Sequence, residues 1–154
     1  MRIEQFLRDK GVEFTVVPHQ DTYDAQRMAQ ALHVPGREVA KTVLLRADSD
    51  FAHIVAVLPA TKSIDLDRVS EALGGSKVEL ATEIEIAHHC PDCEMGVLPP
   101  FGSQYGMKTI VDTSLAEDEE IFFEGNTHHE AIRMKFADFR RIEQPLVFSF
   151  AQQP

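Results

Sequence analysis

The chain has 154 residues, 44% of them hydrophobic and 26% charged, which suits one folded domain over residues 1–154 and excludes a disordered polypeptide. Its formal net charge of −10 has the wrong sign for a protein that holds nucleic acid tightly over a broad basic surface. Residues 1–77 carry 10 Lys or Arg against 11 Asp or Glu, and residues 78–154 carry 5 against 14, so a polyanion is expected to approach the side built by the first half.

Before the first proline–glycine pair, the pattern predicts two short helices and one strand. The first helix is expected to end at Gly11, and a strand follows at residues 14–17. Apolar residues at helical spacing over 25–32 predict the second helix, with Asp21 or Thr22 as its cap.

Two runs rich in β-branched residues, 39–45 and 51–58, predict a hairpin whose connection lies at residues 47–50. Each run is mostly apolar on both faces, so we expect the hairpin to be covered on both sides. His53 is in phase with its apolar neighbours and is expected to be a hydrogen-bonded core histidine.

The second half of the chain alternates short elements with one long loop. Thr82 and Glu85 match a capping box at the start of a helix. Residues 90–106 hold two Cys, three Pro and three Gly, and loops of this length in compact domains are usually functional. An acidic turn at 117–120 is expected to be solvated. The other predicted elements are a helix at 65–73, strands at 77–80, 109–111, 121–123 and 132–136, and a final helix around Phe139.

These elements predict an α+β fold, with a mixed, largely antiparallel, barrel-like sheet that is able to close and is flanked by short helices. Within that sheet Lys41 shares a face with aliphatic residues, which is unusual because lysine is seldom buried without a partner. Two explanations are open. Its stem can lie along apolar surface while the amine reaches water at the sheet rim. Alternatively, the ammonium is held at a cavity mouth to bind a phosphate or a developing oxyanion.

Two loops offer further candidates for a binding site. In Gly96-Val97-Leu98-Pro99-Pro100-Phe101-Gly102, glycine permits unusual backbone angles and proline fixes others, so the loop can hold N–H groups rigidly toward a ligand. Gly125-Asn126-Thr127-His128-His129 is a turn after an apolar strand. Each loop, taken alone, is equally consistent with an ordinary connection.

Together three segments resemble the YbaK / prolyl-tRNA synthetase-associated editing domain family, within a match from about Tyr23 to Phe139. The segments are Val39-Ala40-Lys41-Thr42-Val43, Glu94 to Gly102, and Gly125 to Met134. The resemblance implies a mixed β-barrel flanked by helices, with Lys41 as the family's functional lysine and Gly96 to Pro100 as its G-x-x-x-P loop.

Members of that family hydrolyse the ester between an amino acid and the terminal ribose of tRNA without a metal. The resemblance implies catalytic roles for Lys41 and Gly96: the lysine anchors the tRNA end, and backbone groups near the glycine bind the aminoacyl carbonyl and position water. An activated ester needs orientation and electrostatic help more than a powerful nucleophile. The substrate-binding residues implied are Tyr23, Thr42, Val97, Leu98, Pro99, Pro100, Gly125, Asn126, Thr127 and His128.

The cysteines allow two rival sites. His88-His89-Cys90-Pro91-Asp92-Cys93 holds three or four N and S ligands for zinc, although a full tetrahedral set from six consecutive residues is sterically awkward. A redox Cys-x-x-Cys is the second rival, but this motif follows a helix and enters a loop. We expect a loop with reduced thiols, no metal and no cofactor.

Two functions from different classes follow. The first is a free-standing trans-editing enzyme that clears a small amino acid from tRNA-Pro or a related tRNA, with the aminoacylated 3′ end and an aminoacyl-tRNA synthetase as partners. The second is a non-catalytic module on the same fold that binds a nucleotide or an aminoacyl metabolite. Retention of Lys41 together with the Gly96 loop favours the enzyme, because binding alone requires neither.

Neither a signal peptide nor a membrane span is apparent, so a cytoplasmic location is expected. Some of Arg37, Arg46 and Lys62 are expected beside the mouth of the pocket, where they would meet backbone phosphates. The identity of the amino acid, the identity of the tRNA and the oligomeric state do not follow from the sequence.

Overall fold

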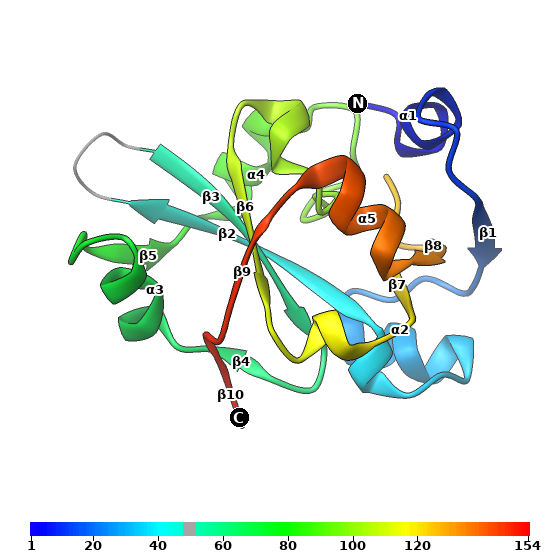
Figure 1. The fold of residues 1–154 in the computed structure, drawn as a ribbon. Coiled ribbons are helices and arrows are strands. Elements are labelled where there is room, and N and C mark those ends of the chain that lie inside the picture. The colour runs from blue at the N-terminus through cyan, green and yellow to red at the C-terminus, as the bar shows by residue number, and fades with distance from the viewer. Residues whose placement is uncertain (48–51) are drawn as a thin grey trace.

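The structure, a computed structural model, describes residues 1–47 and 52–154. Its strands form three hydrogen-bonded sheets (Figure 1). The largest has the strand order β5-β2-β3-β6-β9, built from Val78–Leu80, Ala40–Ala47, Ala52–Pro59, Lys108–Asp112 and Leu146–Phe148. The second has the order β1-β8-β7, built from Phe14–Pro18, Glu130–Lys135 and Glu120–Glu124. In the third, β10 pairs with β4, and their bounds are Ala151–Gln152 and Ser63–Ile64.

Short helices cover these sheets. The α-helices α1 to α5 span Ile3–Asp9, Ala25–Leu32, Leu66–Ala72, Glu83–His89 and Phe136–Glu143. Three 3-10 helices, η1 to η3, span Gly36–Glu38, Gly102–Tyr105 and Leu115–Glu117. Among the described residues, no helix is both long and apolar enough to cross a membrane.

The α+β class is confirmed, and so is the predicted hairpin. Strands β2 and β3 pair antiparallel with Lys41 opposite Leu58, while three of the four connecting residues, 48–50, lie outside the described part of the chain. Strand β6 is parallel to β3 on one side and to β9 on the other. The sheet is therefore mixed, with antiparallel pairing around β2.

The expected closure into a barrel is wrong for the described strands. Both edges of β6 are occupied, so β7 cannot pair with it and instead joins β8. One bridge between Val39 and Phe122 connects the two larger sheets. The segment between β6 and β7 is also less solvated than expected. Asp118 is half-buried there, and burial raises its pKa to about 6, with a further upward effect from the nearby Glu38.

Apolar side chains between the two larger sheets form the main core. Phe101, from the long loop, lies edge-on to Phe123 of β7 and to Phe139 of α5, with ring centroids 5.8 and 5.2 Å apart. Such aromatic contacts fix neighbouring elements more specifically than aliphatic ones do. The loop after Cys93 is consequently anchored in the core, although its first part reaches the surface.

A smaller cluster of buried residues packs α2 against the start of β2 and the neighbouring sheet. Met28 and Ala29 of α2 contact Val39, Phe122 and Ala131. Because the apolar face of α2 is used in this way, its first turn lies over the beginning of β2, where Lys41 is placed.

The predicted cap of α2 is wrong. Asp24 caps the helix, and its side chain accepts a hydrogen bond from the backbone N–H of Arg27 at 2.7 Å. Thr22 is buried two residues before this cap, where its backbone N–H donates to the carbonyl of His128. Pairing of this segment with the turn at 128–129 therefore delays the start of the helix.

Candidate functional site

A cavity of about 210 Å³ lies where the first turn of α2, the start of β2, the Gly96 loop and the end of β7 meet. We call it the Lys41 cavity. Five residues predicted from the sequence line it: Tyr23, Lys41, Thr42, Gly96 and Leu98. The other lining residues are Asp24, Ala25, Met28, Ala40 and Glu124. Four separate segments of the chain therefore meet at one small cavity.

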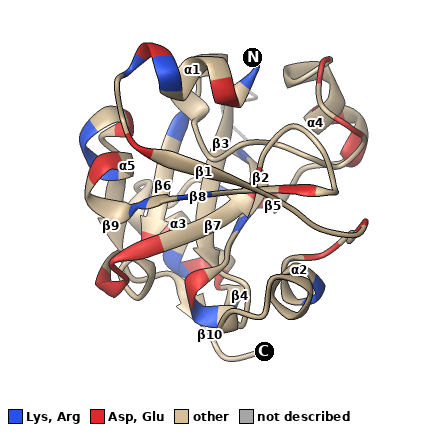
Figure 2. Cartoon of the chain, turned by 90° about the vertical axis from the view of Figure 1, so that its right-hand side faces the viewer, with Lys and Arg blue, Asp and Glu red and all other residues tan. Residues whose placement is uncertain are grey.

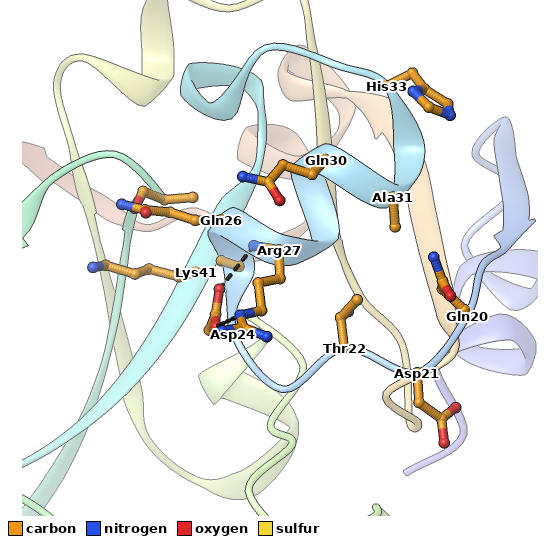
Figure 3. Close-up of a pocket in the computed structure, with 12 residues that line it drawn as sticks. Gln20, Asp21, Thr22, Asp24, Gln26, Arg27, Gln30, Ala31, His33 and Lys41 are labelled. Carbon is orange, nitrogen blue, oxygen red and sulfur yellow. Dashed lines mark hydrogen bonds and ion pairs between the residues drawn. The ribbon is translucent and has the colours of Figure 1, made fainter.

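Lys41 is the second residue of β2 and carries a cationic side chain into this cavity. Its side chain is half-buried, and burial lowers its pKa below the ordinary value. Burial is the only cause of that shift, so no carboxylate of the described residues neutralises the amine. Figure 3 shows Lys41 beside the first turn of α2, which carries Asp24 and Gln26. The amine is thus free to meet an anionic group of a ligand.

Gly96 has a φ of +84°, a region that residues with a Cβ rarely adopt. It is exposed, whereas the following Val97 and Leu98 are buried and hold the loop in place. The backbone N–H of Val97 donates to the carbonyl of Glu94 at 3.0 Å. A rigid loop therefore presents the backbone of Gly96 to the Lys41 cavity.

Seven of the predicted residues lie outside the lining of this cavity: Val97, Pro99, Pro100, Gly125, Asn126, Thr127 and His128. Asn126 is buried, and its side-chain amide fastens the amino terminus. Its oxygen accepts from the N–H of Ile3 at 2.9 Å, and its nitrogen donates to the carbonyl of Met1 at 2.7 Å. The structure places Asn126 at a structural junction behind the cavity.

His128, the last of the predicted residues, links the Gly96 loop to the cavity wall. It is buried, and its Nε2 lies 2.7 Å from the carbonyl oxygen of Met95. Because a carbonyl oxygen only accepts hydrogen bonds, Nε2 carries the hydrogen. The ring of His128 also packs against Tyr23, with centroids 4.7 Å apart. His128 therefore contacts Tyr23, which lines the cavity, and Met95, which precedes the lining residue Gly96.

Glu124 is the lining residue that the sequence did not reveal. It is the last residue of β7, and burial raises its pKa to about 7. The negative charges of Glu94 and Asp24 also raise this pKa, whereas His128 lowers it. A glutamate directly after the apolar residues 121–123 was the available signal, since a charge at the end of a buried strand points to a rim. The Lys41 cavity thus contains one cationic and one acidic side chain with poorly compensated charges.

A wider groove of about 900 Å³, which we call the α2 groove, runs beside this cavity along α2 (Figure 3). Its lining is largely polar and includes Gln20, Gln26 and Gln30, and Lys41 borders both spaces. Thr22 also lines it, and the buried hydroxyl of Thr22 has no hydrogen-bond partner within residues 1–47 and 52–154. The groove therefore offers glutamine amides to a polar ligand.

The region around the cysteines differs from the sequence expectation. Cys90 and Cys93 are joined by a disulfide rather than being reduced, because the turn between them brings their Cα atoms to 5.4 Å. His89 turns away from them, with its Nε2 3.0 Å from Nδ1 of His53. Potential ligand atoms of Cys90, Asp92 and Cys93 lie within 4.8 Å of one another, but the disulfide ties up both sulfurs and the ring of His89 contacts His53 instead.

His53 and Arg46 belong to a network at the far end of β2 from Lys41. His53 is half-buried rather than in the core, and its Nε2 lies 2.5 Å from Glu85. Arg46 pairs with Glu79 at 2.8 Å and with Glu85 at 3.0 Å. Arg46 is therefore held on another edge of the sheet, and neither Arg37 nor Lys62, the other two cations considered for the pocket mouth, is among the residues that line the cavity or the wider groove beside it.

Charges elsewhere on the surface are mixed. In the view of Figure 2 acidic and basic residues are interspersed, and both α1 and α5 carry the two signs. No continuous basic face is apparent in that view among the described residues. A polyanion would therefore find local cations rather than a broad basic surface.

Comparisons with known proteins identify a family model and several proteins that this chain resembles. The sequence model of the aminoacyl-tRNA editing domain matches residues 19–142. The chain is similar to the Multifunctional Ser/Thr-tRNA deacylase ProXp-y of Escherichia coli (strain K12), at 26% identity over 152 residues that cover 97% of this chain and 90% of that protein. It is also similar to a candidate Cys-tRNA(Pro)/Cys-tRNA(Cys) deacylase, EbsC of Enterococcus faecalis, at 28% identity over 110 residues that cover 70% of this chain and 62% of that protein.

Two solved structures share the fold at 18% sequence identity. The hypothetical protein APE2540 matches with a TM-score of 0.88, covering 99% of this chain and 100% of that chain. A candidate trans-editing enzyme for prolyl-tRNA synthetase matches with a TM-score of 0.83, covering 98% of this chain and 95% of that chain.

Proposed function

Because this chain belongs to the aminoacyl-tRNA editing domain family, we propose that it is an aminoacyl-tRNA deacylase, which hydrolyses the ester between an amino acid and the terminal ribose of tRNA. The observation that carries the proposal is the meeting of Lys41 and Gly96 in one small cavity. These two residues come from a strand and a loop that are 55 positions apart in the sequence, and both belong to the segments that resemble the family.

In this proposal Lys41 supplies positive charge to the tRNA end, either to its terminal phosphate or to the oxyanion that forms when water attacks the ester. Backbone N–H groups near Gly96 hold the ester carbonyl, and a hydroxyl of the terminal ribose helps to activate the attacking water. Preorganised donors of this kind act best where water is partly excluded, as beside the half-buried Lys41.

The dimensions of the site support a small amino acid as the substrate. The Lys41 cavity, at about 210 Å³, is smaller than the roughly 300–1,000 Å³ typical of sites for larger ligands. The adjoining α2 groove has room for the terminal nucleotide and offers glutamine amides to its polar edges. We infer that serine and threonine are the first amino acids to test, since the E. coli relative is named as a Ser/Thr-tRNA deacylase.

A panel of aminoacyl-tRNAs tests this function. Pure protein is incubated with tRNA-Pro and other tRNAs carrying serine, threonine, alanine, cysteine or proline, and release of the amino acid is followed over time. We expect release from tRNAs that carry a small, wrongly attached amino acid and little release from correctly charged prolyl-tRNA. Release no faster than in buffer for every member of the panel would overturn the proposal.

A further inference from the structure

The Glu124 carboxylate lines the Lys41 cavity, and within residues 1–47 and 52–154 it forms no ion pair with a lysine or an arginine. Its side chain is 20% exposed, and its nearest positive partner is the ring of His128, with Nδ1 3.3 Å from Oε2. That contact is an ion pair only when the ring is protonated, and by geometry Nδ1 has no hydrogen-bond partner among the described residues. The hydrogen bond from Nε2 to the carbonyl of Met95 holds the ring in this orientation.

The other acidic residues near the cavity are already engaged. Asp24 caps α2 and forms an ion pair with Arg27 at 3.3 Å. Glu94 accepts from the backbone N–H of His128 at 3.2 Å. Glu124 is therefore the acidic group of the cavity that remains available to a cationic group of a ligand.

Every aminoacyl ester carries such a cation, because its α-ammonium group is attached to the carbon next to the ester carbonyl. A carbonyl held at the Gly96 loop would place the ammonium within the same small cavity, which Glu124 also lines. Resting on the proposed function, we propose that Glu124 is the substrate-binding residue that receives the α-ammonium group and orients the ester between the Gly96 loop and Lys41.

The protonation of Glu124 fits this assignment. Burial raises the pKa of Glu124 to about 7, the charges of Glu94 and Asp24 add to the effect, and His128 opposes it. Lys41 faces the same cavity, and no effect of its amine on Glu124 is resolved. An ammonium bound beside the carboxyl favours its ionised form, so binding near neutral pH should release a proton.

Two ester substrates that differ only at the amine provide the test. Ser-tRNA and N-acetyl-Ser-tRNA carry the same tRNA and the same ester, but acetylation removes the positive charge. Wild-type protein should prefer Ser-tRNA by about tenfold to hundredfold in kcat/KM, as expected for a hydrogen bond between charged groups. Glu124→Gln keeps the side-chain shape, and it should slow Ser-tRNA by that factor, mostly through KM, while leaving N-acetyl-Ser-tRNA unchanged.

Glu119→Gln is the matched control, because Glu119 is exposed and precedes β7 by one residue; it should behave as wild type. An equal loss on both substrates in Glu124→Gln, or no preference in the wild type, would overturn the assignment. If the wild-type protein hydrolyses neither substrate, serine is not the amino acid that it removes. The role of Glu124 is then tested by the binding measurement described next.

The binding measurement uses non-hydrolysable 3′-(L-seryl)amino-3′-deoxyadenosine and its N-acetyl form, titrated into the protein by calorimetry at pH 6.5. The free amine should bind about tenfold more tightly, with proton release, and Glu124→Gln should lose both features. Equal affinity of the two analogues for the wild type would contradict the inference, independently of any turnover.

Discussion

Two side chains of opposite charge, Lys41 and Glu124, enter the same cavity from strands of different sheets. Lys41 could be singled out in the sequence, because a lysine inside an apolar strand is conspicuous. Glu124 carried a weaker signal: its place after an apolar strand indicates a rim position, but a glutamate that ends a strand is common and its burial depends on tertiary packing. The residue pattern thus predicted one half of the charge arrangement and missed the other.

Gly96→Ala should slow deacylation, because alanine disfavours the φ of +84° that this loop position adopts. The added Cβ itself has room, with its nearest neighbour at 3.8 Å, so the effect comes from the backbone. We expect kcat/KM to fall by about tenfold or more, because even a small displacement of the reacting groups slows a reaction by such a factor. Gly106→Ala, at a φ of +73° away from the cavity, is the control for strain alone. Equal activity of the two variants would show that the Gly96 loop is only a connection.

Glu124→Gln should change how stability depends on pH. The pKa of Glu124 is about 7 in the folded state and ordinary in the unfolded chain, so the folded state holds this proton more tightly. The free energy of unfolding therefore falls as pH rises from about 4.5 to about 7, by at most about 3 kcal/mol for a shift of this size. The variant lacks this loss of stability. In urea unfolding its free energy of unfolding should therefore be higher than that of the wild type at pH 8, but not at pH 4.5. Parallel pH profiles for the two proteins would contradict the raised pKa.

At the scale of elements, local signals predicted most helices and strands, and tertiary contacts decided the rest. The capping box of Thr82 and Glu85 is present as predicted, because both partners lie within one turn. The cap of α2 is Asp24 rather than a predicted residue. The preceding segment pairs with the turn at 128–129, and this pairing cannot be deduced from neighbouring residues. The disulfide of Cys90 was missed for a similar reason: spacing alone does not give the distance across a turn.

Asn126→Ala tests whether the Gly125 turn is structural or binds substrate. The variant leaves the buried N–H of Ile3 without its acceptor, which should lower the free energy of unfolding by about 1–3 kcal/mol. At temperatures where the variant is folded, its kcat/KM should stay close to that of the wild type. Thr127→Ala, whose hydroxyl makes only a 3.4 Å contact with the backbone of His129, should leave stability nearly unchanged. Unchanged stability with lost activity would assign Asn126 to the substrate instead.

At the scale of the whole molecule, the order of the strands depends on which strand pairs with each free sheet edge, and this cannot be read from the sequence of any single strand. Periodicity located β6 and β7, but not that β9 would take the second edge of β6 and leave the sheets separate. The net charge of −10 acts at the same scale, because it limits long-range attraction to any nucleic acid. We therefore expect recognition to be concentrated at the tRNA end, beside Lys41.

Uncharged tRNA should accordingly bind weakly, with a dissociation constant of about 1 μM or higher at physiological salt, the range of non-specific contacts. Fluorescence anisotropy of labelled tRNA at several salt concentrations measures this directly. Nanomolar binding that resists salt would reveal a dedicated tRNA surface that the mixed charges of Figure 2 do not suggest.

The central claim is that the Lys41 cavity turns over aminoacyl-tRNA rather than only binding it. The most direct test counts amino-acid molecules released per protein molecule, using the aminoacyl-tRNA that the panel clears fastest in large excess. We expect many turnovers for the wild type and for Lys77→Ala, a surface lysine paired with Glu79, and about a hundredfold slower release by folded Lys41→Ala. One-to-one binding without release, or undiminished turnover by Lys41→Ala, would contradict the account.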